Sequence, residues 1–306
     1  MVMRAALAVL IATAAGCDLI DGAGTPPDAA VDADGDAGYL PPRHDVVPAV
    51  GSAATLDLAC WNVENFPDAP VTPAFVADLI TSLDLDLVVV EEVASVAAWN
   101  ELLARLPEHD GVLSRHAYTP TSYQKIGLIY RTGLVTVGEP ELLFPTDTFA
   151  FPRPPFRVPV TVGALTVDLI GVHLKAGVDA ADADRRAAAA VALDGYLRGR
   201  IADGAEPDLI VLGDYNDQFV SPDGAQVLAP LAATDVYRVR TRAAAEAGAA
   251  SFLPSGKVID QIVTTASLDP VIGDRAAVFP PLDQQFPGYQ DVISDHLPAV
   301  LSLPMP

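Results

Sequence analysis

The sequence predicts one α/β domain with mixed sheets over residues 49–304, and three observations support this class. The chain has 306 residues, a length that suits one large domain or two small ones. From residue 53 onward, short apolar runs alternate with helical stretches, as they do in α/β folds. Neither a repeat period nor a second linker interrupts this region. We therefore expect a single domain.

The composition excludes three classes of protein. Hydrophobic residues make up 51% of the chain and charged residues 19%, which is too apolar for a disordered chain. The formal net charge of −22 is opposite in sign to that of a basic nucleic-acid clamp. A protein with several membrane spans would have several long uncharged runs, and this chain has one short run, at its N-terminus.

Residues 1–17 have the features of a secretory signal peptide. Arg4 precedes an apolar run over residues 5–15 that is too short to span a bilayer. The sequence AAGC at residues 14–17 resembles a bacterial lipobox with Cys17 as the lipidated residue, although Ala14 stands where a large aliphatic residue is usual. We expect an exported protein, either a cell-envelope lipoprotein (periplasmic or on the outer surface) or a secreted one. Its contact with a membrane would be through the lipid anchor alone. A native apolar strand or helix is the remaining alternative.

Residues 18–48 are interpreted as a disordered acidic linker. They are rich in Asp, Ala, Gly and Pro and cannot bury enough apolar surface to offset the entropy of ordering. A calcium site at Asp32, Asp34 and Asp36 is the weaker alternative, because the terminal glutamate of an EF-hand loop is missing. The only other cysteine is Cys60, in an apolar run, and we favour a free buried thiol over a bridge to Cys17.

The elements of the domain follow from apolar runs and helix signals. Runs of four to eight apolar residues bounded by Gly, Pro or Asp indicate strands. They lie at 56–63, 85–90, 126–130, 158–162, 165–173, 209–212, 258–263 and 299–303. Helices are predicted at 73–83, 95–106 and 184–201. The third has acidic residues near its start and arginines near its end, which suits the helix dipole.

Polar side chains gather where these predicted strands end, the place where α/β folds carry their sites. Each short motif alone is weak evidence for a functional site, because Asp and Asn also form turns. Glu91 and Glu92 are neighbours on one strand, so at most one of them can point into a cleft. The motifs are WNVENF at 61–66, VVVEEV at 88–93, GVHLK at 171–175, LGDYND at 212–217, IDQI at 259–262 and SDHLP at 294–298.

Taken together and in this order, these motifs resemble the endonuclease/exonuclease/phosphatase superfamily, which has the deoxyribonuclease-I-like fold. The resemblance runs from Leu56 to Leu301, and the residues of the motifs are most similar to those of secreted bacterial nucleases. It implies a four-layer α/β (α+β) fold in which helices flank a two-sheet β-sandwich. It also implies a magnesium-dependent phosphoesterase, with Mn²⁺ and Ca²⁺ as alternative metals. Glu91 departs from the family, which commonly has Gln there.

The resemblance also implies roles for individual residues. Glu92 matches the principal metal ligand, and Asn62, Glu64 and Asp295 match residues at or beside the metal. Asp214 matches the residue that orients or deprotonates the attacking water, and Asn216 a phosphate ligand. His296 matches the catalytic histidine and Asp260 its carboxylate partner. His173 falls where some members carry a histidine that contacts phosphate or donates a proton.

General chemistry supports these roles. Mg²⁺ prefers carboxylate, amide and water oxygens, whereas zinc would need His or Cys clusters that this sequence lacks. A histidine held by a carboxylate stays oriented and can be protonated, which suits contact with a phosphate oxygen. Lys175 and Arg153 are candidates for binding substrate phosphate, and solvated or structural positions are the alternatives for such loop charges.

The charge of the chain bears on the substrate, a phosphoester of nucleic acid or of a small molecule. Residues 1–47 hold 7 acidic and 2 basic residues, so the remainder holds 40 − 7 = 33 acids and 18 − 2 = 16 bases, a net of −17. DNA affinity comes largely from Lys and Arg that neutralise phosphates. A nuclease is the first hypothesis, a phosphatase or phosphodiesterase on a sugar phosphate or lipid head group the second, and a non-catalytic binding module the third. We expect a monomer.

Overall fold

The computed structural model describes residues 46–204, 207–286 and 288–306. The expected signal peptide and lipobox at 1–17 lie outside the described residues, as does nearly all of the expected linker. Val47, the second residue described, is buried in the hydrophobic core, so packed structure reaches at least two residues before position 49. Within the described part of the chain, no helix has the length and apolar character needed to cross a membrane.

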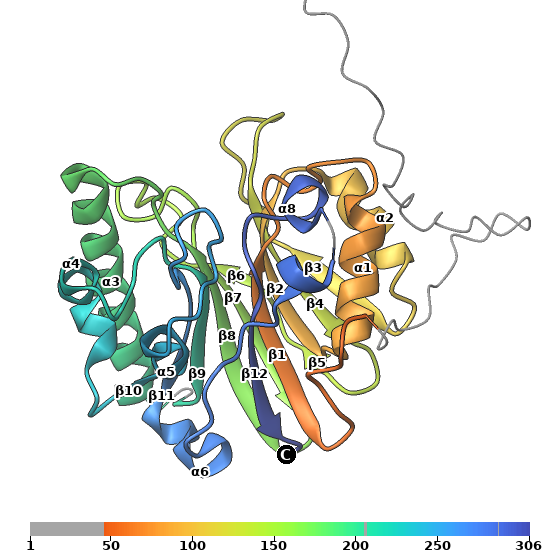
Figure 1. Cartoon of the computed structure of the whole chain (residues 1–306). Helices are drawn as coiled ribbons and strands as arrows, with labels where there is room; N and C mark the ends of the chain where they lie inside the picture. Colours follow the sequence, from red (N-terminus) through yellow and green to blue (C-terminus); the bar gives the residue numbers. More distant parts are fainter. Residues whose placement is uncertain (1–45, 205–206, 287) are drawn as a thin grey trace, which may run out of the picture. The chain divides into compact units, whose positions relative to one another are not determined.

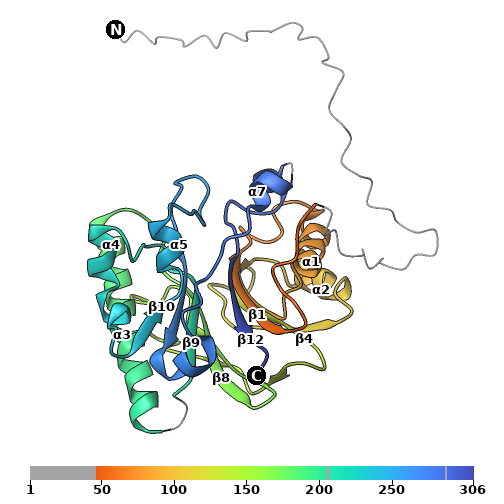
Figure 2. The ribbon, with the colours of Figure 1, turned by 60° about the horizontal axis from the view of Figure 1, so that its bottom comes forward.

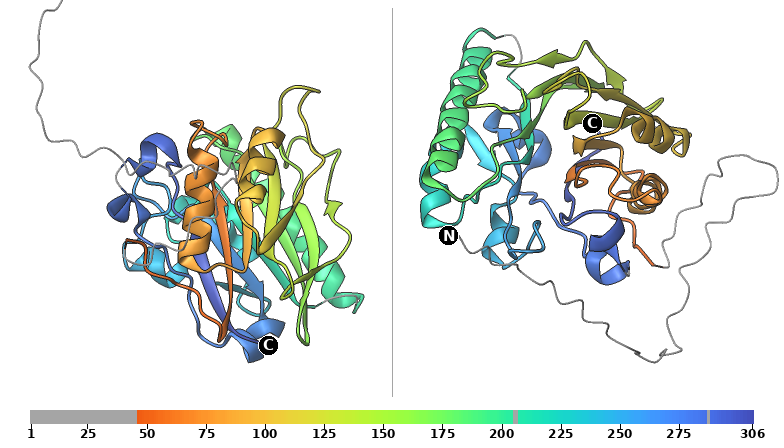
Figure 3. Two further views of the ribbon diagram at one scale, coloured as in Figure 1. Left: turned by 90° about the vertical axis from the view of Figure 1, so that its right-hand side faces the viewer. Right: turned by 90° about the horizontal axis from the view of Figure 1, so that it is seen from above.

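Two sheets pack face to face with helices outside both (Figures 1 and 3). The first sheet has the strand order β12-β1-β2-β4-β3. Its β1 is parallel to β2 and antiparallel to β12, so the chain's last strand lies beside its first. The strands are β1 (Thr55–Asn62), β2 (Leu87–Val93), β3 (His109–Leu113), β4 (Lys125–Arg131) and β12 (Ala299–Pro304).

The second sheet has the order β10-β11-β9-β8-β7-β5, and β6 pairs with β7 beside this path. Within it, β8 and β9 are parallel, and β11 runs antiparallel to β9. Figure 2 shows this sheet beside the first. Its strands are β5 (Thr136–Val137), β6 (Glu141–Leu142), β7 (Phe156–Val162), β8 (Leu165–His173), β9 (Leu209–Asp214), β10 (Tyr237–Val239) and β11 (Asp260–Thr265).

The helices cover the outer faces of the two sheets. On the first sheet lie α1 (Thr72–Leu83) and α2 (Val96–Ala104), and on the second lies α3 (Ala180–Ala202). The shorter helices lie in loops of the second half of the chain. They are α4 (Pro222–Val227), η1 (Ala229–Ala232), α5 (Arg242–Glu246), η2 (Ala266–Leu268), α6 (Asp269–Ile272), α7 (Leu282–Gln285) and α8 (Tyr289–Val292).

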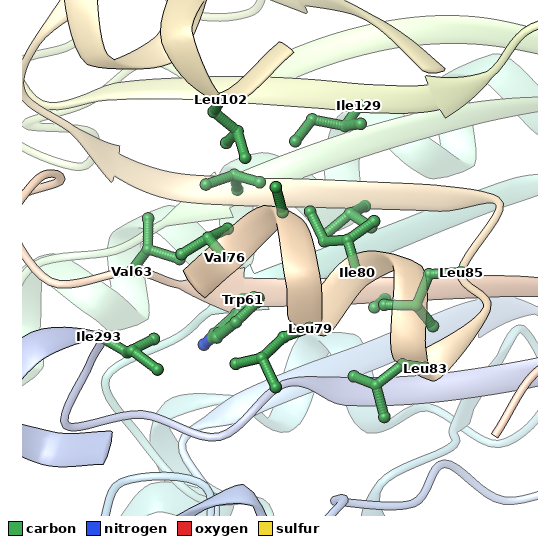
Figure 4. Close-up of a cluster of buried hydrophobic side chains, with 14 of the residues drawn as sticks. Trp61, Val63, Val76, Leu79, Ile80, Leu83, Leu85, Leu102, Ile129 and Ile293 are labelled. Carbon is green, nitrogen blue, oxygen red and sulfur yellow. The ribbon is translucent and has the colours of Figure 1, made fainter. Parts of the chain in front are cut away.

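Three hydrophobic cores correspond to this layering. One joins the first sheet to α1 and α2, with Trp61 and Ile80 buried in it (Figure 4). The second fills the space between the sheets, where Gly171 lies so close to Ile126 and Val89 that a Cβ would be 2.8 Å from each. The third lies between α3 and the second sheet. The predicted fold class, a two-sheet sandwich flanked by helices, is confirmed.

Most predicted elements are present with shifted ends. The strand at 165–173 is found as predicted, and the helix predicted at 184–201 begins four residues earlier, at Ala180. Strand β3 was not predicted, because its sequence HDGVL contains Asp and Gly and its side chains are only partly buried. Strands β5, β6 and β10 have two or three residues each, too few to form a pattern.

Candidate active site

The chain order of the strands brings the polar motifs to one edge of the sandwich. Asn62 ends β1, His173 ends β8 and Asp214 ends β9. Strand β1 is parallel to β2, and β8 is parallel to β9, so within each pair the carboxyl ends of the strands lie together. Asp260 begins β11, which is antiparallel to β9, and it lies opposite Asp214 in the register. This edge therefore carries residues from the carboxyl ends of some strands and from the amino end of another.

A break in strand β2 separates the two neighbouring glutamates. The pairing of β2 with β4 shifts between Val90 and Val93, and Glu92 has a positive φ of 63°. Glu91 turns into the interior and has no exposed surface, whereas the Glu92 side chain remains partly open. The prediction that at most one of the pair faces the site is confirmed.

The interior carboxyl of Glu91 has no hydrogen-bond partner among the described residues. Burial, together with the charges of Asp260 and Asp214, raises the pKa of Glu91 well above its usual range. The departure from Gln at this position therefore places beneath the site a carboxyl whose ionisation is opposed by burial.

Asn62 links the two central carboxylates. Its amide nitrogen donates to Asp214 Oδ2 at 3.1 Å and to Glu92 Oε1 at 3.4 Å, and its oxygen accepts the Glu64 N–H at 3.0 Å. In this conformation the nitrogen of Asn62 orients the carboxylates, and its oxygen, which accepts one N–H, keeps a second lone pair. His173 lies against the same two carboxylates, with Nε2 at 3.5 Å from Asp214 and 3.7 Å from Glu92.

Asp214 is held by amides in a buried setting. Asn216 donates to it twice, from its backbone N–H at 2.7 Å and from its side-chain nitrogen at 3.0 Å. Burial and the charge of Asp260 raise the pKa of Asp214 to about 7, although His296 and these amides oppose the shift. A carboxylate with a pKa near neutrality can both accept and release a proton.

His296 and Asp260 form a buried pair. Nδ1 of His296 lies 2.8 Å from Asp260 Oδ2, and Nε2 lies 3.7 Å from Asp295 Oδ1. Burial alone would lower the pKa of His296, but the charges of Asp260, Asp214 and Asp295 outweigh it and raise the pKa to about 10. The imidazole is thus protonated at neutral pH. His173 differs, because burial lowers its pKa well below the usual value and leaves it neutral.

The backbone that carries His296 is fixed to the first hydrophobic core. Trp61 Nε1 donates to the His296 carbonyl oxygen at 3.2 Å and to the Tyr289 hydroxyl at 3.1 Å, and that hydroxyl donates to the same carbonyl at 2.5 Å. Ser294 donates from its hydroxyl to the Asn62 carbonyl and accepts the His296 N–H. These bonds place the last motif of the chain against the first.

The substrate-binding candidates differ in their surroundings. Arg153 reaches the site and donates to Gln124. The Lys175 ammonium instead pairs with Asp182 at 2.9 Å, at the start of α3. Arg186 is buried and bonds to Asp217 and to the carbonyls of Lys175 and Gly177. It therefore ties together the loops that follow β8 and β9.

Comparison with known proteins identifies the family. The model of the endonuclease/exonuclease/phosphatase family matches residues 59–296, which is most of the chain. The chain belongs to the endonuclease/exonuclease/phosphatase family. Members of this family are hydrolases that act on phosphoester bonds. No curated protein sequence is a significant match.

Solved structures of family members share the fold at low identity. A family member from Bacteroides vulgatus is 18% identical with a TM-score of 0.61, covering 82% of this chain and 99% of its own. TDP2 from D. rerio, complexed with a single-strand DNA product, is 18% identical with a TM-score of 0.59 and the same coverage. The human nocturnin catalytic domain with bound sulfate is 16% identical with a TM-score of 0.61, covering 83% and 94%. At these identities the likeness shows the fold alone.

Family enzymes generally use divalent metals, and the residues of this member fit a hydrated one. Among the described residues, no group of three or more His, Cys, Asp or Glu forms a ready-made metal cluster. Mg²⁺, however, usually keeps several waters and needs only one or two carboxylates. Here the Asp295 N–H donates to Glu64 Oε2 at 3.1 Å, and the charge of Glu92 acts on both Glu64 and Asp295. Burial and mutual repulsion raise the pKa values of Glu64 and Asp295, a strain that a cation would relieve.

Two residues at this family member's site were missed by sequence reasoning. Gln124 donates from Nε2 to Glu92 Oε2 at 3.0 Å, and Asn65 donates from its backbone to the same oxygen at 2.8 Å. Gln124 immediately precedes β4, which runs antiparallel to β2, so the amino end of β4 lies at the edge of the site. Because only the carboxyl ends of strands were considered as positions for the site, Gln124 was not identified from the sequence.

Proposed function

We propose that the protein is an exported, divalent-metal-dependent phosphodiesterase that acts as a nuclease. The observation that carries this proposal is the contact of one amide, Asn62 Nδ2, with both Glu92 and Asp214. It brings the expected metal ligand and the expected proton acceptor to the same point. Hydrolysis of a phosphodiester needs both an activated water and compensation of charge on the phosphoryl oxygens.

The described residues can supply the proton transfers. Asp214, with a pKa of about 7 that reflects its burial, accepts a proton from the attacking water near neutral pH. Its carboxylate is fixed by Asn62 and Asn216, so its orientation is set before substrate binds. His296 is kept protonated by Asp260, and its Nε2 can donate a hydrogen bond to a phosphoryl oxygen.

The remaining groups bind charge. Glu92, with Glu64 and Asp295 beside it, would hold Mg²⁺, which when bound supplies Lewis acidity at a phosphoryl oxygen. Arg153 forms no ion pair with a carboxylate in the described part of the chain, so its guanidinium can contact substrate phosphate. Neutral His173 can accept or donate one hydrogen bond between Asp214 and Glu92.

Two observations bear on the class of substrate, and they point in different directions. The residues of the motifs support nuclease activity, as does the likeness to TDP2, which was crystallised with a single-strand DNA product. The net charge of −17 outside residues 1–47 instead favours a small phosphoester, because duplex binding depends on cationic contacts. A phosphatase or phosphodiesterase acting on small esters is therefore the second candidate.

One experiment separates these candidates. Purified protein and its Asp214→Ala variant are incubated with plasmid DNA, RNA and a panel of small phosphoesters, with and without Mg²⁺. The proposal predicts metal-dependent cleavage of nucleic acid that the variant lacks. Intact nucleic acid together with turnover of a small ester would favour the second candidate. Inactivity on every substrate would favour a binding module.

Export and anchoring belong to the same proposal and rest on the sequence of residues 1–17. Expression in a bacterial host, followed by separation of envelope and soluble fractions, tests them. Wild-type protein is expected with the envelope, and Cys17→Ser protein in a soluble exported fraction. Wild-type protein that stays in the cytoplasm would contradict export.

A further inference from the structure

We propose that Gln124 is a positioning residue, which holds the Glu92 carboxylate and the Arg153 guanidinium at opposite ends of one side-chain amide. The inference rests on the proposed function, in which Glu92 binds the metal and Arg153 the phosphate. It adds a residue that no sequence motif identified and a reason why these two opposite charges stay apart.

The contacts use the full capacity of the amide. The oxygen of Gln124 accepts from Arg153 Nε at 3.2 Å and Nη2 at 2.5 Å, and from the Tyr118 hydroxyl at 3.3 Å. The nitrogen donates to Glu92 Oε2 at 3.0 Å and to Asn65 Oδ1 at 2.7 Å. An amide has two donor hydrogens and two acceptor lone pairs, so none is left over.

These neighbours also fix which way the amide points. A flipped amide would set its oxygen against the Glu92 carboxylate and its NH₂ group against the Arg153 guanidinium, and both contacts would be repulsive. The environment therefore allows one orientation. Gln124 is half-buried at the first position before β4, and the strand fixes its backbone.

For Glu92, the consequence is that its two oxygens differ. Oε2 already accepts two N–H groups, from Gln124 and from the Asn65 backbone. Among the described residues, Oε1 has only the longer contacts with Asn62, at 3.4 Å, and His173, at 3.7 Å. Oε1 is thus the oxygen left open for a cation, and Gln124 helps to choose it.

For Arg153, the consequence is that it stays close to the site without neutralising it. An ion pair with Glu92 would remove the charge that attracts the metal and occupy the guanidinium. Gln124 offers Arg153 a neutral acceptor in place of a carboxylate. The guanidinium has five N–H donors, and Gln124 engages two of its nitrogens, so donors remain for a phosphate.

The test uses the full chain as wild type, Gln124→Leu, Arg153→Ala, the double variant and Thr121→Ala, a control at an exposed position in the same loop. Mn²⁺ binding is measured by calorimetry without substrate, and KM and kcat with bis(p-nitrophenyl) phosphate. We expect Gln124→Leu to raise the Kd for Mn²⁺ about tenfold, and by less when Arg153 is also replaced, because no guanidinium can then pair with Glu92. Arg153→Ala should raise KM and leave the Kd for Mn²⁺ unchanged. Gln124→Leu should raise KM only while Arg153 is present.

Two results would overturn the inference. One is a Kd for Mn²⁺ in Gln124→Leu within twofold of wild type, and the other is a KM effect of equal size with and without Arg153. Gln124→Met replaces Gln124→Leu if thermal melts show that the latter does not fold. Wild-type protein that binds Mn²⁺ but hydrolyses no ester would refute the proposed function alone, because the Mn²⁺ comparison would still decide the role of Gln124.

Discussion

Replacing Asp260 with Asn tests the electrostatic state of the buried His296. The Asp260 carboxylate is the main charge that keeps this imidazole protonated, with a pKa of about 10 against the ordinary 6.5. That difference corresponds to on the order of 5 kcal/mol, at about 1.4 kcal/mol for each tenfold change. Without the carboxylate, burial opposes the smaller contributions of Asp214 and Asp295, and we expect the pKa to fall towards 6.5.

The assay is the pH dependence of kcat/KM, together with the NMR titration of the His296 ring. At pH 8 a histidine with a pKa of 6.5 is only about 3% protonated, so Asp260→Asn should lose about 30-fold in kcat/KM there. Most of this loss should be recovered at pH 6, where the imidazole is protonated again. The wild-type enzyme should keep a protonated His296 until the pH approaches 10.

The protonated His296 should also make the free energy of unfolding depend on pH. The folded-state pKa of His296 lies above its unfolded value, so its stabilising contribution is complete below pH 6.5 and is lost as the pH rises towards 10. The difference in unfolding free energy between wild type and Asp260→Asn should therefore shrink across that range. Asp223→Asn, at an exposed position on α4, is the matched control. Identical pH profiles and ring titrations for wild type and Asp260→Asn would refute the reasoning.

Three further predictions concern Gly213, Asp214 and Arg131. In Gly213→Ala, a Cβ at φ 136° would lie 2.1 Å from the Val172 carbonyl oxygen, so chemical denaturation should show a loss of about 3 kcal/mol or more. In metal-free protein, the raised pKa of Asp214 should lower the free energy of unfolding as the pH rises from about 4 to about 7. Mg²⁺ should therefore raise Tm more at pH 8 than at pH 5 in scanning fluorimetry. An equal rise at both pH values would contradict this. Arg131→Leu leaves the buried Asp86 without its cation and should cost about 2 kcal/mol in urea unfolding, with kcat/KM unchanged because the pair lies away from the site.

The sequence was a good guide to the elements whose burial imposes a pattern. The run 165–173 is apolar because β8 is buried between two layers, and its ends were predicted correctly. The edge strand β3 is only partly buried, so its sequence carries no such pattern. The start of α3 was placed too late because Ala180 and the residues after it give little apolar periodicity.

The site was predictable where a short motif fixes both chemistry and backbone. Asp214 ends β9 and Asn216 lies in the turn that follows it, while His296 and its neighbours lie just before β12. Gln124 could not be found in this way, because its role depends on pairing between β2 and β4 and on a loop 29 residues further along the chain. The pairing of Lys175 with Asp182 was equally invisible, since it depends on where α3 begins.

Metal-dependent hydrolysis of bis(p-nitrophenyl) phosphate by the full chain, compared between wild type and Asp214→Asn, tests the central claim most directly. Asn keeps the shape of the side chain but cannot take a proton from water. The account predicts hydrolysis by wild type that requires a divalent metal, is stopped by a chelator, and falls at least a hundredfold in Asp214→Asn while Tm is retained. Equal rates for the two proteins, or hydrolysis that persists in the chelator, would contradict it.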